Sequence, residues 1–165
     1  MKKFISAILI IIVCLSCFAG CSQQESQKTA KDNLAVYSFG GSDEHLTVSN
    51  GVIVLGGEEE VFSGGELAVL NSDELSDIAS WSTEFYVLTD GEKRTVQKNH
   101  IVDVDAGAKV ELSGDLGKIA GPDVITEYES SDDDFADNLY FVFSGTDKKG
   151  KESVYEIRMD VTRVK

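Results

Sequence analysis

The chain has 165 residues, a length typical of one domain or at most two. Apolar residues make up 42% of it and charged residues 27%, as in ordinary globular proteins. Asp and Glu total 29 against 15 Lys and Arg, which gives a formal net charge of −14. This balance excludes a typical nucleic-acid-binding protein, because neutralising phosphates requires a concentrated cationic face.

The first twenty residues have the composition of an export signal. Lys2 and Lys3 precede an apolar run over residues 4–15, and the small residues Ala19 and Gly20 follow it. The run is shorter than the ~20 apolar residues that cross a bilayer. The order of cationic, apolar and small residues is that of a cleaved signal peptide, which we predict over residues 1–20.

The end of this segment, Phe18-Ala19-Gly20-Cys21, resembles the lipobox of bacterial lipoproteins, with Phe18 where Leu, Val or Ile is commoner. The resemblance implies that the thiol of Cys21 receives a diacylglyceryl group and that a signal peptidase cuts the chain before it. Cys14 and Cys17 are competing acceptors, but the residues before them fit the pattern less well. An uncleaved signal anchor is the alternative interpretation.

Lipidation of Cys21 predicts where the protein acts. Cleavage leaves a mature chain with one acylated Cys, so neither a disulfide nor a thiolate nucleophile remains. Loss of Lys2 and Lys3 leaves 13 basic residues against 29 acidic ones, a formal charge of −16, which disfavours adsorption to anionic lipids. Two acyl chains nevertheless hold a protein stably on a bilayer. We therefore expect a lipid-anchored protein on the extracytoplasmic face of the cell membrane.

Residues 21–33 form the predicted anchor and tether. From Ser22 to Asn33 the chain has no large apolar residue, so this segment cannot contribute to a core. Twelve such residues behaving as a coil span about 20 Å. We expect the remaining domain, residues 34–165, to stand just off the lipid headgroups.

From Leu34 onward, apolar and polar residues alternate with period two, as in β-strands. Segments 80–88 and 155–162 alternate clearly, and segment 138–144 is apolar on both faces, as in a central strand. Shorter strands are predicted over residues 34–39, 45–49, 52–55, 61–62, 66–70, 93–97, 100–104 and 109–113. Turns between strands are predicted at Asn50-Gly51, Gly64-Gly65, Asp90-Gly91 and residues 147–150.

The strands are too many and too short for one flat sheet. The sequence therefore predicts an all-β fold, an immunoglobulin-like sandwich of two antiparallel sheets. Short helical turns are expected near residues 71–78, where Asn71-Ser-Asp-Glu74 resembles a capping box, and near residues 131–135. Stretches 36–39, 48–55 and 83–95 are similar to small lipoproteins of Gram-positive bacteria, a resemblance that implies no activity.

Histidine is the commonest general base, and the chain has two, His45 and His100. Neither has a second ligand at the spacing of a zinc site. Both lie beside a turn or an Asn, where an exposed His needs no functional explanation. We favour this interpretation over a catalytic or metal-binding role.

Acidic residues crowd the stretch from Glu127 to Asp137. Hard cations such as Ca²⁺ prefer oxygen ligands, which Asp-rich loops can supply. The spacing of an EF-hand fails from Asp103, because Ala108 and Gly114 stand where Gly and an acid are needed. We favour a solvated loop, with Asp132, Asp133 and Asp134 as the candidate metal ligands should a cation bind.

Aromatic residues suggest either a sugar-binding platform or core packing. Trp81 and Phe85 share a face with Val87, which favours the core, whereas Tyr86 points the opposite way. Tyr128 and Tyr140 are further candidates for a platform. A glycosidase would need two carboxylates ~5–10 Å apart, and the sequence selects no such pair.

Together these features predict a membrane-anchored, non-catalytic binding or interaction module without a cofactor. Its expected partners are the lipid bilayer, through Cys21, and an envelope protein or glycan, not nucleic acid. Two alternatives stay open: a Ca²⁺-dependent binding module that uses the acidic loop, and a small cell-envelope hydrolase.

Overall fold

The computed structural model describes residues 34–56, 59–71, 73, 75–101, 112–122, 124–125 and 135–165. The predicted signal peptide, Cys21 and the tether lie outside these residues, as do Asp132, Asp133 and Asp134. The described residues form strands and no helix. The strands are β1 (Ala35–Ser42), β2 (Leu46–Leu55), β3 (Glu60–Ser63), β4 (Glu66–Val69), β5 (Ile78–Thr89), β6 (Glu92–Ile101), β7 (Gly114–Asp115), β8 (Lys118–Gly121), β9 (Leu139–Asp147), β10 (Glu152–Arg158) and β11 (Asp160–Arg163).

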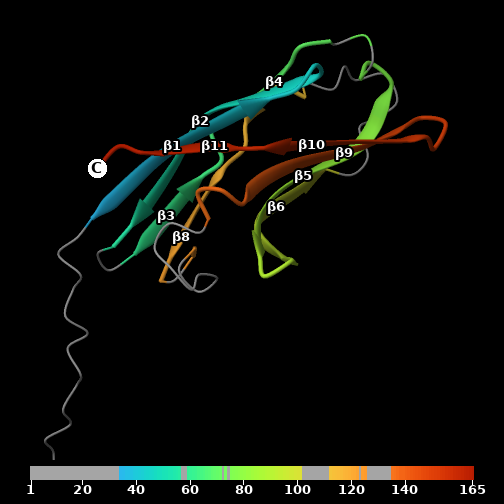
Figure 1. Cartoon of the computed structure of the whole chain (residues 1–165). Helices are drawn as coiled ribbons and strands as arrows, with labels where there is room; N and C mark the ends of the chain where they lie inside the picture. Colours follow the sequence, from blue (N-terminus) through green and yellow to red (C-terminus); the bar gives the residue numbers. More distant parts are fainter. Residues whose placement is uncertain are drawn as a thin grey trace, which may run out of the picture. The chain divides into compact units, whose positions relative to one another are not determined.

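The strands form two antiparallel sheets, which confirms the predicted two-sheet sandwich (Figure 1). Sheet A has the order β11-β1-β2-β3-β8, with β4 paired to β2 and β7 paired to β4. Sheet B has the order β10-β9-β5-β6. The apolar segment around Phe141 is a central strand as predicted, because β9 lies between β10 and β5.

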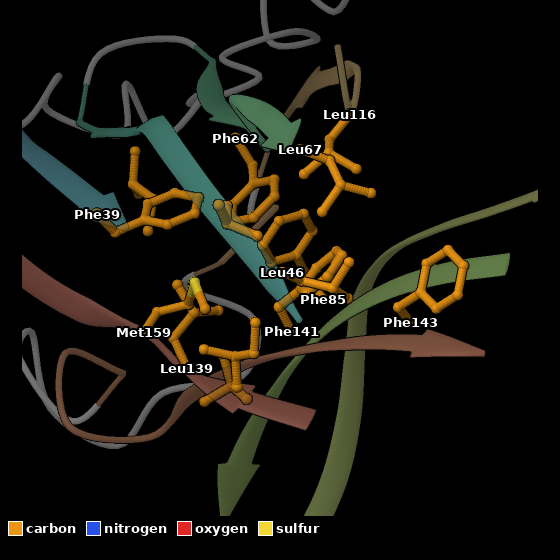
Figure 2. Close-up of a cluster of buried hydrophobic side chains, with 14 of the residues drawn as sticks. Phe39, Leu46, Phe62, Leu67, Phe85, Leu116, Leu139, Phe141, Phe143 and Met159 are labelled. Atoms are coloured by element: carbon orange, nitrogen blue, oxygen red, sulfur yellow. The ribbon is translucent and has the colours of Figure 1, made fainter. Parts of the chain in front are cut away.

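The core lies between the inner faces of the two sheets, where aromatic rings from both meet. Phe85 of β5 lies 5.7 Å from Phe39 and 5.1 Å from Phe62 between ring centroids, and 5.0 Å from Phe141 of its own sheet. Figure 2 shows these rings pointing toward one another from β1, β3, β5 and β9. All four are at most 4% exposed, so alternate residues of each strand supply the core that the period-two pattern predicts.

Helical turns were expected near residues 71–78 and 131–135. The described residues of these two regions form turns and no helix. Asp73 and residues 75–77 form turns, and the Ser76 hydroxyl donates a hydrogen bond to the Asp73 carbonyl (2.9 Å). In the second region only Phe135 is described, and it begins a turn that runs to Asn138.

The prediction of a tight turn at Asn50-Gly51 is wrong, because β2 runs without interruption through both residues. Asn50 has a φ of 60° and lies in a β-bulge, where the register of β2 against β1 shifts by one residue. Gly51 is opposite Phe39, and a Cβ there would lie 2.3 Å from the Phe39 ring. Glycine is therefore required so that this ring can cover the strand.

Gly64-Gly65 also differs from the predicted turn between two strands. β3 and β4 both pair antiparallel with β2, on successive stretches of it, so the chain continues in one direction through the glycines. Gly65 has a φ of +76°, and a Cβ on it would lie 2.1 Å from the Ser49 carbonyl oxygen in the β2 bulge. The Gly64-Gly65 break between β3 and β4 thus lies beside the Asn50-Gly51 bulge of β2.

Two other turns are confirmed. Asp90 and Gly91, with φ of 52° and 80°, join β5 to β6 as the two-residue hairpin that the pair predicts. Between β9 and β10, Asp147 Oδ1 accepts hydrogen bonds from the amides of Lys149 and Lys151, both 2.8 Å.

Two of the predicted strands differ from the structure. The final predicted strand is divided at Met159, which is 1% exposed: β10 belongs to sheet B and β11 to sheet A. The strand predicted over residues 109–113 is described only at Leu112 and Ser113, which are not in a strand. The short strands β7 and β8 follow instead.

Candidate functional site

The outer face of sheet B is the more polar of the two outer faces of the sandwich. Residues of β5 alternate, so Phe85 and Val87 enter the core while Ser82 and Glu84 point outward. Pairing places Ser82 beside His100 on β6 and beside Ser144 on β9. The sheet therefore collects hydroxyl groups on one surface from strands that are far apart in the sequence.

A shallow depression of about 170 Å³ lies on this face. It lies where the small side chains of Ser82 and Ser144 are paired on β5 and β9 and are flanked by larger residues of β6 and β10. Val154 on β10, 62% exposed, stands at one side, and His100 on β6 at the other. The depression is lined by Ser80, Trp81, Ser82, His100, Ser144, Gly145, Thr146, Glu152 and Val154.

A second polar group lies further along the same face, around Tyr86. The Tyr86 ring stacks against Tyr140 of β9, with centroids 5.1 Å apart and planes at 9°. Its hydroxyl donates a hydrogen bond to Glu156 (3.0 Å), and the Lys93 ammonium lies 4.2 Å from its ring centroid. Lys93 also contacts Glu84 at 3.0 Å. These contacts order the rings and leave Tyr86 only 6% exposed.

The surroundings of Tyr86 and Glu84 shift the pKa values of both side chains. Burial, followed by the hydrogen bond to the Glu156 carboxylate, raises the pKa of Tyr86 to about 12. Burial tends to raise the pKa of Glu84, but the Thr95 hydroxyl and the Lys93 ammonium together hold that pKa below its usual range. Tyr86 is therefore a neutral donor at physiological pH and Glu84 an ionised acceptor.

The aromatic residues singled out in the sequence are divided between the two faces. Phe85 is in the core, and Trp81 packs against that core, its ring stacked 6.0 Å from Phe143, as their shared face with Val87 predicts. Tyr86 and Tyr140 lie together on the outer face of sheet B, as two of the residues proposed for a platform. Tyr128 lies outside the described residues.

The two histidines lie in different surroundings. His45, between β1 and β2, packs on the Tyr155 ring at 4.5 Å between centroids, and its Nε2 lies 3.3 Å from Glu44. His100 lines the depression. Among the described residues no three His, Cys, Asp or Glu side chains are grouped so as to hold a metal ion. The acidic stretch with Asp132, Asp133 and Asp134 is outside that part of the chain.

The hydroxyls of the depression were missed from the sequence. Ser80 and Ser82 alternate on β5, which marks them as outward-facing, but Ser144 and Thr146 join them only through the pairing of β5 with β9. Alternation along β5 therefore indicates the first two hydroxyls, whereas the two on β9 can be located only once the strand pairing is known.

The chain matches no protein-family model, no curated protein and no solved structure. In the part of the chain that the structure describes, no helix is long and apolar enough to span a bilayer.

Proposed function

We propose that this protein is a lipid-anchored, extracytoplasmic binding module that acts without catalysis, and that the outer face of sheet B is its binding surface. The sequence supports the anchor through the lipobox-like Phe18-Ala19-Gly20-Cys21. The observation that carries the binding surface is the hydroxyl-lined depression between His100 and Val154.

The chemistry of the depression favours a ligand rich in hydroxyl groups. Serine and threonine hydroxyls both donate and accept hydrogen bonds, as the hydroxyls of a sugar do, and the Glu152 carboxylate adds an acceptor. Its volume, about 170 Å³, is below the ~300–1,000 Å³ of enclosed small-molecule sites. It is suited to one unit of a larger polymer that lies across the sheet. We therefore propose an envelope glycan as the ligand class.

Tyr86 and Tyr140 extend this surface. Ser82 and Tyr86 are four positions apart along β5, a distance of about 14 Å. An extended glycan lying along β5 and β9 would reach the depression and the stacked tyrosines together. The half-buried Tyr140 ring offers a flat apolar plane for a sugar face.

The test uses the full chain in detergent micelles and purified cell-wall glycan strands as the probe. Ser144→Leu fills the depression with a branched side chain and should reduce retention on the glycan by about tenfold or more, a loss of one good interaction site. Ser38→Leu, the same change on the outer face of sheet A, is the matched control and should leave retention unchanged. Equal retention of both variants, or no retention of the wild type, would contradict the glycan proposal.

The anchor is tested separately with Cys21→Ala. We expect this variant to move from the membrane fraction to the soluble fraction of cells, because no acyl chain then holds it. Mass spectrometry of the wild type should find the mature N-terminus at an acylated Cys21. Firm membrane attachment of Cys21→Ala would contradict the anchorage.

A further inference from the structure

Positive charge in this acidic protein gathers on sheet B. Residues 78–101 and 139–158 include its four strands and both of its hairpin turns. They contain seven of the 13 Lys and Arg residues of the predicted mature chain and six Asp and Glu residues, a formal charge of +1. The rest of the mature chain therefore carries −17 out of −16 in total. An anionic ligand is repelled by most of the molecule and can approach sheet B.

Three of these cations lie in one turn at the end of the depression. The turn joins β9 to β10 and contains the exposed residues Lys148, Lys149 and Lys151, which we call the lysine turn. It lies between Thr146 and Glu152, which are paired and which both line the depression. Within the described residues, none of the three ammonium groups is in an ion pair, so their charge can act on a ligand.

The carboxylate inside this turn is engaged by the backbone. Asp147 Oδ1 accepts hydrogen bonds from the amides of Lys149 and Lys151, and the Asp147 amide donates to the Lys151 carbonyl (2.9 Å). The amides of Lys151 and Lys149, and then the charges of both side chains, hold the pKa of Asp147 below its usual range. Asp147 thus orders the turn, and residues 147–151 keep a formal charge of +2.

A further cation lies beyond the opposite side of the depression. Lys98 is two positions before His100 on β6, so both side chains are on the outer face, about 7 Å apart along the strand. Lys98 is paired across the strands with Glu84, whose carboxylate also lies 3.0 Å from the Lys93 ammonium. Two cations therefore share one carboxylate, which leaves an excess of positive charge there.

The spacing of these charges frames one unit of a ligand. The row that contains Lys98 and the row that contains Thr146 are four positions apart along β9, a distance of about 14 Å. Between them lie Ser82 and Ser144. The Glu152 carboxylate at the margin of the depression would repel an anion inside it. The depression therefore suits an uncharged, hydroxyl-bearing unit, with anionic groups on either side.

We propose that the glycan bound by sheet B is anionic and that the lysine turn and Lys98 hold its negative groups. The inference rests on the proposed function, because it specifies the charge of the ligand proposed for the same depression. A lysine ammonium is a compact point charge with rotating donors, which binds phosphate and carboxylate oxygens alike. The ligand class is thus a glycan with negative groups on both sides of an uncharged unit.

Anionic lipid headgroups are a poorer occupant of the lysine turn. A membrane surface is much wider than sheet B, so contact with it would also bring the rest of the chain, with its charge of −17, against anionic lipid. A single glycan strand contacts only the face along which it lies. On that face Glu156 already accepts the hydrogen bond of the Tyr86 hydroxyl (3.0 Å).

The test uses the full chain in detergent micelles at low ionic strength. The probes are neutral cell-wall glycan strands and the same strands derivatised with phosphate or with carboxylate groups. We expect the wild type to be retained about tenfold more strongly on at least one charged strand than on the neutral strand. The triple variant Lys148→Gln/Lys149→Gln/Lys151→Gln should lose about tenfold on the charged strand, because each exposed ion pair contributes a factor of about two to three. It should keep its retention on the neutral strand.

The matched control removes the same charge elsewhere. Lys118→Gln/Arg163→Gln/Lys165→Gln changes β8, β11 and the C-terminal residue, and should leave retention on every probe within about twofold of the wild type. Equal losses in the two triple variants would mean that overall charge, not the lysine turn, governs retention, and would overturn the inference. Thermal melts within a few degrees of the wild type show that each variant is folded, and Lys98→Gln, a single exposed change, should lose about two- to threefold.

The outcomes separate this inference from the proposed function. Equal retention of the wild type on neutral and charged strands overturns the anionic ligand and leaves the glycan surface standing. No retention on any strand overturns the proposed function, and the inference with it. In micelles that contain anionic lipid, the ratio of wild-type to lysine-turn-variant retention on the charged strand should be unchanged. A ratio that falls to one there would mean that lipid headgroups occupy the lysine turn, and would overturn its assignment to the glycan.

Discussion

The two outer faces of the sandwich share one core but differ in chemistry. Behind Phe85 and Phe141, sheet B presents hydroxyls, ionised groups and a shallow depression to solvent. Behind Phe39 and Phe62, sheet A presents Val36, Val54 and Val61 side by side. Further along the same sheet it carries three exposed acidic residues, Glu66, Asp115 and Asp160. The inward residues are constrained to similar apolar types by packing, so the outward residues are where the two sheets are free to differ. That difference is the basis for the proposal that the outer face of sheet B holds the binding surface.

The largest expected effect comes from removing the core that both faces share. Phe85→Ala should lower the free energy of unfolding by about 3–5 kcal/mol, because the Phe85 ring contacts Phe39, Phe62 and Phe141. Denaturant unfolding measures the loss. Leu70→Ala, at a site 58% exposed, is the control and should cost far less. Similar losses for both variants would mean that the two sheets are not joined through this aromatic cluster.

A smaller change should act from within sheet A. Gly51→Ala forces a methyl group against the Phe39 ring, at a cost of about 1–3 kcal/mol. Gly121→Ala is the matched control in β8, since its Cβ would meet only Val124 at an ordinary 3.7 Å. Glycan retention by sheet B should survive Gly51→Ala at temperatures where the protein stays folded. If both alanines cost the same, the close contact of Phe39 with β2 is not what fixes the bulge.

The third effect is confined to sheet B and to high pH. The folded-state pKa of Tyr86, about 12, is above the ordinary value of 10.0, so the protonated phenol is stabilised by folding. This contribution is fully present below pH ~10 and is lost as the pH rises from there through about 12. Tyrosinate absorbance should contain one late-ionising residue fewer in Tyr86→Phe than in the wild type, while Tyr155→Phe, at a half-buried position, should keep the late step of Tyr86. An unchanged number of late-ionising residues in Tyr86→Phe would contradict the assignment.

The sequence predicted elements whose signals are local. Alternation gave β5 with its buried Thr83, Phe85 and Val87, and Asp90-Gly91 gave the hairpin after it. Asn50-Gly51 carries the same local signal for positive φ, yet it forms a bulge. What distinguishes the two is the Phe39 ring over Gly51, a contact between different strands that no local pattern reveals.

The candidate site depended on the same long-range information. Ser82 is recognisable as outward-facing, but the depression exists because β9 brings Ser144 beside it and β6 brings His100. Sheet order, which sequence periodicity does not specify, is therefore what assembles the depression.

The central claim, a folded module on the extracytoplasmic side of the membrane, is tested most directly by thiol labelling in intact cells. A membrane-impermeant maleimide is applied to cells that carry Val154→Cys at the depression, 62% exposed, or Val48→Cys in the core, 1% exposed. We predict rapid labelling at position 154 and labelling at least about tenfold slower at position 48, because a buried thiol reacts only when the fold opens locally. Equal labelling at the two positions, or labelling at position 154 only after the cells are lysed, would contradict the account.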